Sequence, residues 1–336
     1  MDIKVSNRTL GRVEFYRRKF VVLILCGFFV FALGVDTSLR GVHVEIADAA
    51  EPQEPPRAMW VWDVKIFQDN DATERLLDFC KEKNINLLFY TAYKVSGRPE
   101  SDYKKFNSKA HKRGILVQAL AGDPRWALEK YHHQILEWIS EILRFNSACA
   151  INERFDGVHI NVEPYLLGKL WEQNNKDVLT QCLDMHEKAK SLVDQSGVLV
   201  TFATDVPFWY DDDTDMWIEW HKKVSPANYH ILDIVDQIAI MDYRNFAQGE
   251  NGSILLAKNE MSYAQIAGKK VYIGQETGKN LDPSYVTFGG TNIDYMEKEI
   301  RKLVNAYINN NSFAGIAIHH YVSYKRLLKE SGKIVE

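Results

Sequence analysis

The chain is poor in cysteine and has no long run of basic residues. Four cysteines occur in 336 residues, one of them in an apolar N-terminal stretch, and those at 80, 149 and 182 show no paired spacing. This pattern excludes a disulfide framework and a zinc motif, and we expect small core residues instead. With 41 Lys and Arg against 45 Asp and Glu, the chain also lacks the basic patch of a nucleic-acid-binding protein.

A glycine-rich phosphate loop is missing where a dinucleotide-binding fold would need it. The first apolar strand candidate runs into "MWVWDVKIFQD", which contains no glycine. Such a fold uses glycines after its first strand to bring the backbone close to a pyrophosphate. The sequence also contains no internal repeat.

One long hydrophobic run is present, "FVVLILCGFFVFALGV" at 20–35, directly after Arg17, Arg18 and Lys19. Sixteen residues span roughly 24 Å as a helix, short of the roughly 30 Å of a bilayer core. We therefore expect residues 1–50 to be a signal peptide or an uncleaved signal anchor, and both remain open. The basic flank predicts an extracytoplasmic location for the rest, secreted or membrane-anchored. Residues 51–57 form a Pro/Glu linker.

From residue 58 to 336, apolar β-type runs alternate with amphipathic helical patterns. Helical spacing predicts helices at 72–83, 132–145, 178–193 and 295–308. Near-continuous apolar runs are typical of parallel strands buried on both faces. Eight of them indicate a (β/α)8 TIM barrel. The strand candidates are 58–63, 85–93, 114–123, 155–164, 197–205, 235–244, 270–278 and 313–321.

Polar and aromatic residues gather at the carboxyl ends of these strands, where TIM-barrel enzymes place their active sites. The loop at 207–217, with four aromatics and four aspartates, is either a ligand-facing lid or a solvated acidic turn. The candidate binding residues at this rim are Trp60, Trp62, Asp63, Tyr90, His159, Asp205, Trp209, Asp242, Arg244 and His319.

The segment "FDGVHINVEP" at 155–164 carries the strongest chemical signal. His159, Asn161 and Glu163 share one strand face, with Glu163 nearest the mouth. A carboxyl group that loses water there keeps its proton and can act as a general acid, as glycosidic bond hydrolysis requires. The alternative is a structural carboxylate paired with Arg244.

This segment resembles the fourth-strand signature of family 18 glycoside hydrolases, the chitinase-like barrels. Their pattern is Asp-Gly-x-Asp-x-Asp-x-Glu; Asp156, Gly157 and Glu163 match it, whereas His159 and Asn161 replace two aspartates. "IAIMDYR" is similar to the family's Met-x-Tyr-Asp segment, with Tyr243 in register. His319 stands where the family has tryptophan, so Trp60 or Trp62 would have to supply the floor of the sugar site.

The Asn-x-Glu variant is similar to family 85 endo-β-N-acetylglucosaminidases. That resemblance implies substrate-assisted hydrolysis of a polysaccharide with N-acetylated sugars. Asn161 would hold the acetamido group, Glu163 would act as acid and then base, and Tyr243 would contact the oxazolinium. No metal or organic cofactor is expected, and the expected partner is a glycan, with no nucleic acid; the oligomeric state is open.

Three alternatives remain at this stage. Glu276, at the end of the seventh strand in "GQETG", could pair with Glu163 in a retaining glycosidase, for which a carboxyl separation of about 5–5.5 Å is typical. The barrel could bind carbohydrate without turnover. His159, His319 and Asp205 could converge on a metal, as metal-dependent deacetylation would need.

Overall fold

A computed structural model of the chain describes residues 56–95, 97, 99–211 and 214–334. The predicted signal or anchor segment at 20–35 lies outside these residues, so its prediction stays open. Across the described part of the chain, every helix is too short or too polar to cross a membrane.

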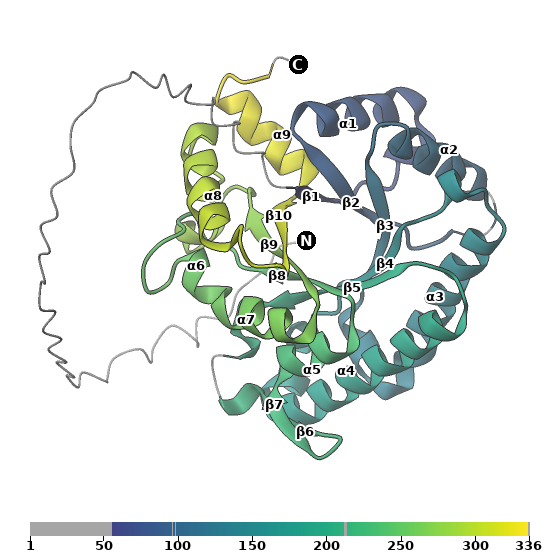
Figure 1. The fold of residues 1–336 in the computed structure, drawn as a ribbon, viewed down its shortest axis with the longest axis vertical. Coiled ribbons are helices and arrows are strands. Elements are labelled where there is room, and N and C mark those ends of the chain that lie inside the picture. The colour runs from purple at the N-terminus through teal and green to yellow at the C-terminus, as the bar shows by residue number, and fades with distance from the viewer. Residues whose placement is uncertain (1–55, 96, 98, 212–213, 335–336) are drawn as a thin grey trace, which may run out of the picture. The chain divides into compact units, whose positions relative to one another are not determined.

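Eight parallel strands close into a barrel ringed by helices, which confirms the predicted TIM-barrel fold (Figure 1). Each strand pairs in parallel with both neighbours around the ring, in the order β1-β10-β9-β8-β5-β4-β3-β2. All eight predicted runs supply one strand. Their bounds are β1 Arg57–Val61, β2 Ile85–Thr91, β3 Leu116–Ala121, β4 Gly157–Ile160, β5 Thr201–Pro207, β8 Gln237–Met241, β9 Lys270–Glu276 and β10 Phe313–His319.

The four predicted helices are present and surround the barrel with others. Capping side chains define some of their starts: Asp69 accepts from the backbone N–H groups of Asp71 and Ala72 at the start of α1. The helices are α1 Asn70–Glu82, α2 Glu100–His111, α3 His132–Ser147, α4 Lys169–Gln195, α5 Ala227–Ile234, α6 Ser253–Leu256, α7 Lys258–Ala267, α8 Ile293–Tyr307 and α9 Tyr321–Glu330.

Alternation along the strands builds two separate hydrophobic cores. One strand face packs against the helices, as with Met59, Leu88 and Tyr90. The other face fills the barrel interior with a smaller cluster that includes Trp60 and Phe89. Because side chains alternate across a strand, every second residue faces the barrel interior and the others face the helices. We call these two sets the inward and the outward parity. The cysteines at 80, 149 and 182 are free and buried in the outer core, as predicted.

The acidic aromatic segment after β5 contains structure that the sequence did not predict. Short 3-10 turns at Phe208–Tyr210 and Thr214–Met216 lead into an antiparallel hairpin, β6 Trp217–Trp220 and β7 Lys223–Pro226. The Trp220 indole N–H donates to Asp184 of α4 (2.8 Å), which holds the hairpin against that helix. Residues 212 and 213 of the predicted lid lie outside the described residues.

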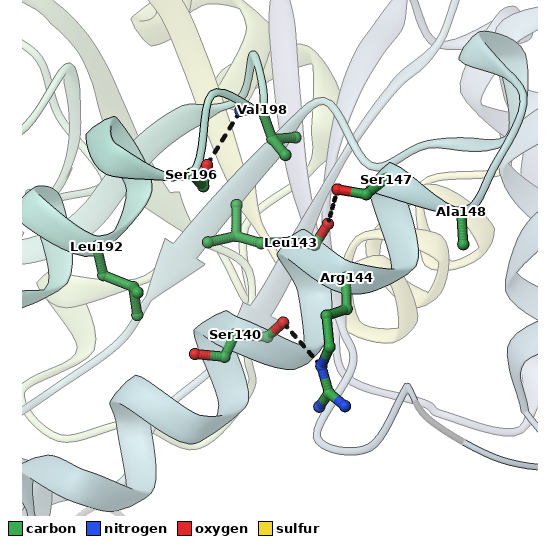
Figure 2. A pocket seen from close by; sticks show the side chains of 8 residues that line it. All are labelled: Ser140, Leu143, Arg144, Ser147, Ala148, Leu192, Ser196 and Val198. Carbon is green, nitrogen blue, oxygen red and sulfur yellow. Dashed lines mark hydrogen bonds between the residues drawn. The ribbon is translucent and has the colours of Figure 1, made fainter.

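A hollow of about 440 Å³ lies between α3 and α4 (Figure 2). Its lining includes Leu143 and Ser147 from α3 and Leu192 and Ser196 from the end of α4 or just beyond it. Both helices lead from there into the amino ends of strands. This hollow is therefore at the end of the barrel opposite to the predicted rim, and its lining has no carboxyl group.

Candidate active site

Glu163 stands at the mouth of the barrel, three residues beyond the end of β4. It precedes a 3-10 turn, Pro164–Leu167, in which the Leu166 N–H donates to the Glu163 carbonyl (3.0 Å). Proline lacks an N–H and has a fixed φ, so it ends strand pairing and favours the first position of such a turn. The turn brings Tyr165 back onto the side chain of Glu163.

Each oxygen of the Glu163 carboxyl group has one hydrogen-bond donor. The Asn161 amide donates to Oε1 (3.1 Å), and the Tyr165 hydroxyl donates to Oε2 in the closest contact of this site. The other amide atom of Asn161, Oδ1, is buried and has no hydrogen-bond partner among the described residues. This amide orientation suits an ionised Glu163, because only the nitrogen can donate to a carboxylate.

Burial raises the pKa of Glu163 above the ordinary value for glutamate. The Asp205 carboxylate raises it further, while the donors Tyr165 and Asn161 and the ring of His319 act in the opposite direction. The balance favours a carboxyl group that retains its proton at a higher pH than an exposed glutamate, which is the property a general acid needs.

His159 and Asp205 form a buried pair inside the barrel, below Glu163. The His159 ring binds Asp205 through Nε2 (2.8 Å) and Gln118 through Nδ1 (3.0 Å). Trp60 donates its indole N–H to the other Asp205 oxygen (3.2 Å). Both His159 and Trp60 are almost completely buried. Asp205 of β5 thus places a carboxylate directly beside His159 of β4.

Both carboxyl oxygens of Glu276, at the end of β9, bind other protein groups. Its Oε1 accepts from the backbone N–H groups of Thr277 (2.8 Å) and Gly278 (2.5 Å), and its Oε2 contacts Nδ1 of His319 (2.6 Å). Burial works to raise the pKa of Glu276, but His319 and the backbone donors outweigh burial and lower it. Glu276 is therefore an ionised anchor for His319.

His319 links this anchor to Trp62. Burial works to lower the pKa of His319, but the Glu276 carboxylate outweighs it and raises that pKa. Trp62 donates its indole N–H to His319 Nε2 (3.1 Å), a contact that requires a lone pair on that nitrogen. With Nδ1–H directed at Glu276, the Trp62 contact belongs to the neutral ring, whereas the raised pKa extends the range of the imidazolium, which keeps the Glu276 contact and loses the one to Trp62. Trp62 is partly exposed, and Trp60 is only 1% exposed, so Trp62 is the tryptophan that a ligand can reach.

Tyr243, just after β8, lies among the carboxyl groups of the site. Its ring is 5.6 Å from that of His319. Burial raises the pKa of Tyr243 well above the ordinary value, and the carboxylates of Glu276, Asp205 and Glu163 add to the effect. Gly274 is required by the backbone of the next strand, since a Cβ there would lie 2.6 Å from the Ile240 carbonyl oxygen; Trp60 (3.3 Å) and Tyr243 (3.4 Å) pack beside it.

An aromatic group flanks Glu163 on the side of β5. Tyr165 packs edge-on against Trp209 (5.3 Å between ring centroids) and Trp171 (6.4 Å). Trp209 was predicted from the sequence. Trp171 and Tyr165 were not, because no strand or helix periodicity relates them to Glu163. The only available signal was the position of Tyr165 directly after Glu163-Pro164.

Several predicted binding residues do not join this group. Tyr90 and Asp242 have the outward parity: Tyr90 packs in the outer core, and Asp242 is completely buried, where burial raises its pKa well above the ordinary value. Asp63 is exposed and caps its own turn by accepting from the Lys65 N–H. Arg244 does not pair with Glu163; it lies over the rings of Phe208 and Tyr285.

A metal centre finds no support among the described residues, which contain no group of three or more His, Cys, Asp or Glu side chains arranged to hold an ion. Both ring nitrogens of His159 and both of His319 bind protein partners. The three residues considered as a metal site thus serve two separate hydrogen-bonded pairs.

The electrostatic role of Asp205 gives a testable result. In Asp205→Asn, the pKa of Glu163 is expected to fall, because a nearby negative charge that disfavours the carboxylate is removed. The new amide can donate to His159 Nε2 if the imidazole proton moves to Nδ1, where Gln118 accepts it. The 13C shift of the labelled Glu163 carboxyl carbon, followed against pH, measures this. Asp294→Asn, at an exposed acid of α8, is the control; an unchanged Glu163 pKa in Asp205→Asn would contradict the prediction.

Solved structures similar to this chain are TIM barrels of low sequence identity. A GH18 chitinase from Pseudoalteromonas aurantia is 10% identical, with a TM-score of 0.52 over 83% of this chain and 99% of that one. A chitinase from Bacteroides thetaiotaomicron is 12% identical, with a TM-score of 0.50 over 80% and 90%. A GH5_18 protein from Streptomyces cattleya in complex with Manb1-4GlcNAc is 13% identical, with a TM-score of 0.54 over 79% and 70%.

At these identities the likeness establishes the class of fold. The chain matches no family model, and no curated protein matches it in sequence. The chemistry of the site therefore has to be argued from its own residues.

Proposed function

We propose that this chain is a glycoside hydrolase that cleaves a β-linked glycan containing N-acetylated sugars, with the acetamido group of the substrate as nucleophile. The observation that carries the proposal is the Asn161 amide. Its nitrogen donates to Glu163, and its buried Oδ1 has no partner among the described residues. An unpaired buried carbonyl oxygen is costly, and the N–H of a 2-acetamido group is a donor that would satisfy it.

The chemical steps follow from that placement. The acetamido oxygen attacks C1 while the bond from C1 to the leaving oxygen breaks, and Glu163 gives its proton to that oxygen. Water then attacks C1 of the oxazolinium, Glu163 takes a proton from it, and the acetamido group is restored with net retention at C1. Burial of Glu163 supports the first role, and the three carboxylates around Tyr243 favour keeping its hydroxyl protonated as a hydrogen-bond donor to the ring.

A retaining mechanism with Glu276 as nucleophile has less support. The three donors on the Glu276 oxygens stabilise its negative charge and lower its nucleophilicity, and its contact with His319 directs Oε2 at that ring. The fold of the chitinase neighbours and of the GH5_18 neighbour agrees with a hydrolase of either kind. Action outside the cytoplasmic membrane is part of the proposal and rests on the residue pattern at 17–35.

The full-length protein should discriminate between substrates with and without the acetamido group. We expect hydrolysis of 4-nitrophenyl N,N′-diacetyl-β-chitobioside, with kcat/KM at least about 10²-fold above that for the β-cellobioside, because the latter lacks the internal nucleophile. Release of 4-nitrophenol measures both. Comparable kcat/KM values on the two substrates would favour the mechanism in which two carboxylates act as acid/base and nucleophile. Binding of chito-oligosaccharides without turnover of any substrate would identify a carbohydrate-binding barrel.

A further inference from the structure

The two donors on Glu163 orient its carboxyl group. Asn161 donates to Oε1 through its amide nitrogen, and the hydroxyl of Tyr165 donates to Oε2. Each carboxyl oxygen has a second lone pair, so the acidic proton can reside there while both donors stay in place.

Tyr165 is held in place while its hydroxyl hydrogen remains free to rotate. The 3-10 turn of Pro164–Leu167 fixes its backbone, and the edges of Trp171 and Trp209 confine its ring. Rotation about the Cζ–Oη bond moves only the hydrogen. The phenol can therefore keep its hydrogen directed at Oε2 as Glu163 titrates.

We propose that Tyr165 is the positioning residue of the candidate acid: its hydroxyl donates to Oε2 of Glu163 and holds the carboxyl group in one orientation, which leaves the acidic proton free to point toward the leaving oxygen. The catalytic consequence rests on the proposed hydrolase function. The hydrogen bond itself does not.

The other charged or titratable groups facing this pair come from several elements. Asp205 on β5 and His319 on β10 act on Glu163, with opposite signs. Tyr210, from the turn at Phe208–Tyr210, and Tyr243, after β8, act on Tyr165. Burial and the neighbouring Glu163 raise the pKa of Tyr165 well above the ordinary value, so the phenol stays protonated throughout the range in which Glu163 titrates. Tyr165 thus remains a neutral hydrogen-bond donor to Glu163 throughout that range.

Tyr165→Phe in the full-length protein tests the proposal by removing one hydroxyl and keeping the ring. A donor to the carboxylate lowers its pKa, so its loss should raise the pKa of Glu163, as followed by the 13C shift of the labelled carboxyl carbon. If the hydrolase function holds, the basic limb of the profile of kcat/KM against pH should move to higher pH, because Glu163 keeps its proton to a higher pH. We also expect kcat to fall about tenfold from looser orientation of the acid.

Tyr103→Phe, at a buried tyrosine of α2 in the outer core, is the matched control and should leave both quantities unchanged. In the unmodified protein, the 13Cζ signal of Tyr165 should shift at the pH where Glu163 titrates, a reading that needs no variant. The proposal would be overturned if the Glu163 pKa stayed constant or fell in Tyr165→Phe. It would also be overturned if the Tyr165 signal did not change as Glu163 titrates. If the Glu163 pKa rises in Tyr165→Phe but the original protein hydrolyses no substrate, only the hydrolase function is refuted and the positioning role of Tyr165 stands.

Discussion

Replacement of Glu163 by glutamine is expected to lower kcat on N,N′-diacetyl-β-chitobiosides by about 10³-fold, within the range that a general acid contributes. Glutamine keeps the shape of the side chain and an acceptor oxygen for Asn161 or Tyr165, but it has no proton to give to the leaving oxygen. An activated leaving group such as 4-nitrophenol needs less protonation than a sugar does. The loss should therefore be larger on a natural oligosaccharide than on the chromogenic substrate, and comparing the two rates measures the acid role directly.

Glu129→Gln provides a matched control for that variant. Glu129 is an exposed glutamate in the segment after β3, on the same rim of the barrel, so the same chemical change there should leave kcat within about twofold, as surface substitutions usually do. Glu163→Gln with more than a third of the original kcat on both substrates would mean that the acid lies elsewhere.

Glu276→Ala is expected to reduce the free energy of unfolding by about 3–5 kcal/mol, measured by urea denaturation at neutral pH. The change removes a buried ionised group and leaves two backbone N–H groups and the His319 ring without their acceptor. Because the pKa of Glu276 is lowered in the folded state, its stabilising contribution is present above the ordinary glutamate pKa and is lost as the pH falls through the folded value. The stability difference between the variant and the original protein should therefore narrow in acid.

The same variant separates the two hydrolytic mechanisms. Under substrate assistance, folded Glu276→Ala should lose less activity than Glu163→Gln, and added azide should not accelerate it. If Glu276 were the nucleophile, kcat should fall at least as far as in Glu163→Gln, and azide should restore turnover while forming a glycosyl azide of inverted configuration. Product anomers distinguished by NMR decide between these outcomes.

Parity along the strands explains which predicted site residues the fold brings together. Trp60, His159, Asp205 and His319 have the inward parity, and they meet in the barrel although up to 259 positions separate them. Tyr90 and Asp242 were chosen from the sequence because they lie near strand ends, but they are one residue out of phase with Phe89 and Tyr243. The alternation that excludes them is visible in the sequence once the inward face is known.

The position of Tyr165 could not be predicted in this way. After Pro164 the chain leaves the strand for a 3-10 turn, in which neither the two-residue nor the 3.6-residue period applies. Its contact with Glu163 depends on the angle of that turn and on the packing of Trp171 and Trp209, which arrive from α4 and from the segment after β5.

Hydrophobic periodicity is a local property of consecutive residues, so it is enough to predict the barrel, its eight strands and the position of Glu163 at the carboxyl end of the fourth. The contacts of Glu276 with His319, of Asp205 with His159 and of Tyr165 with Glu163 are known only from the folded chain. These are contacts between side chains whose partners are chosen by the closure of the ring and the direction of short turns. Distances of a few ångströms across a barrel depend on all the strands at once, and no single stretch of residues encodes them.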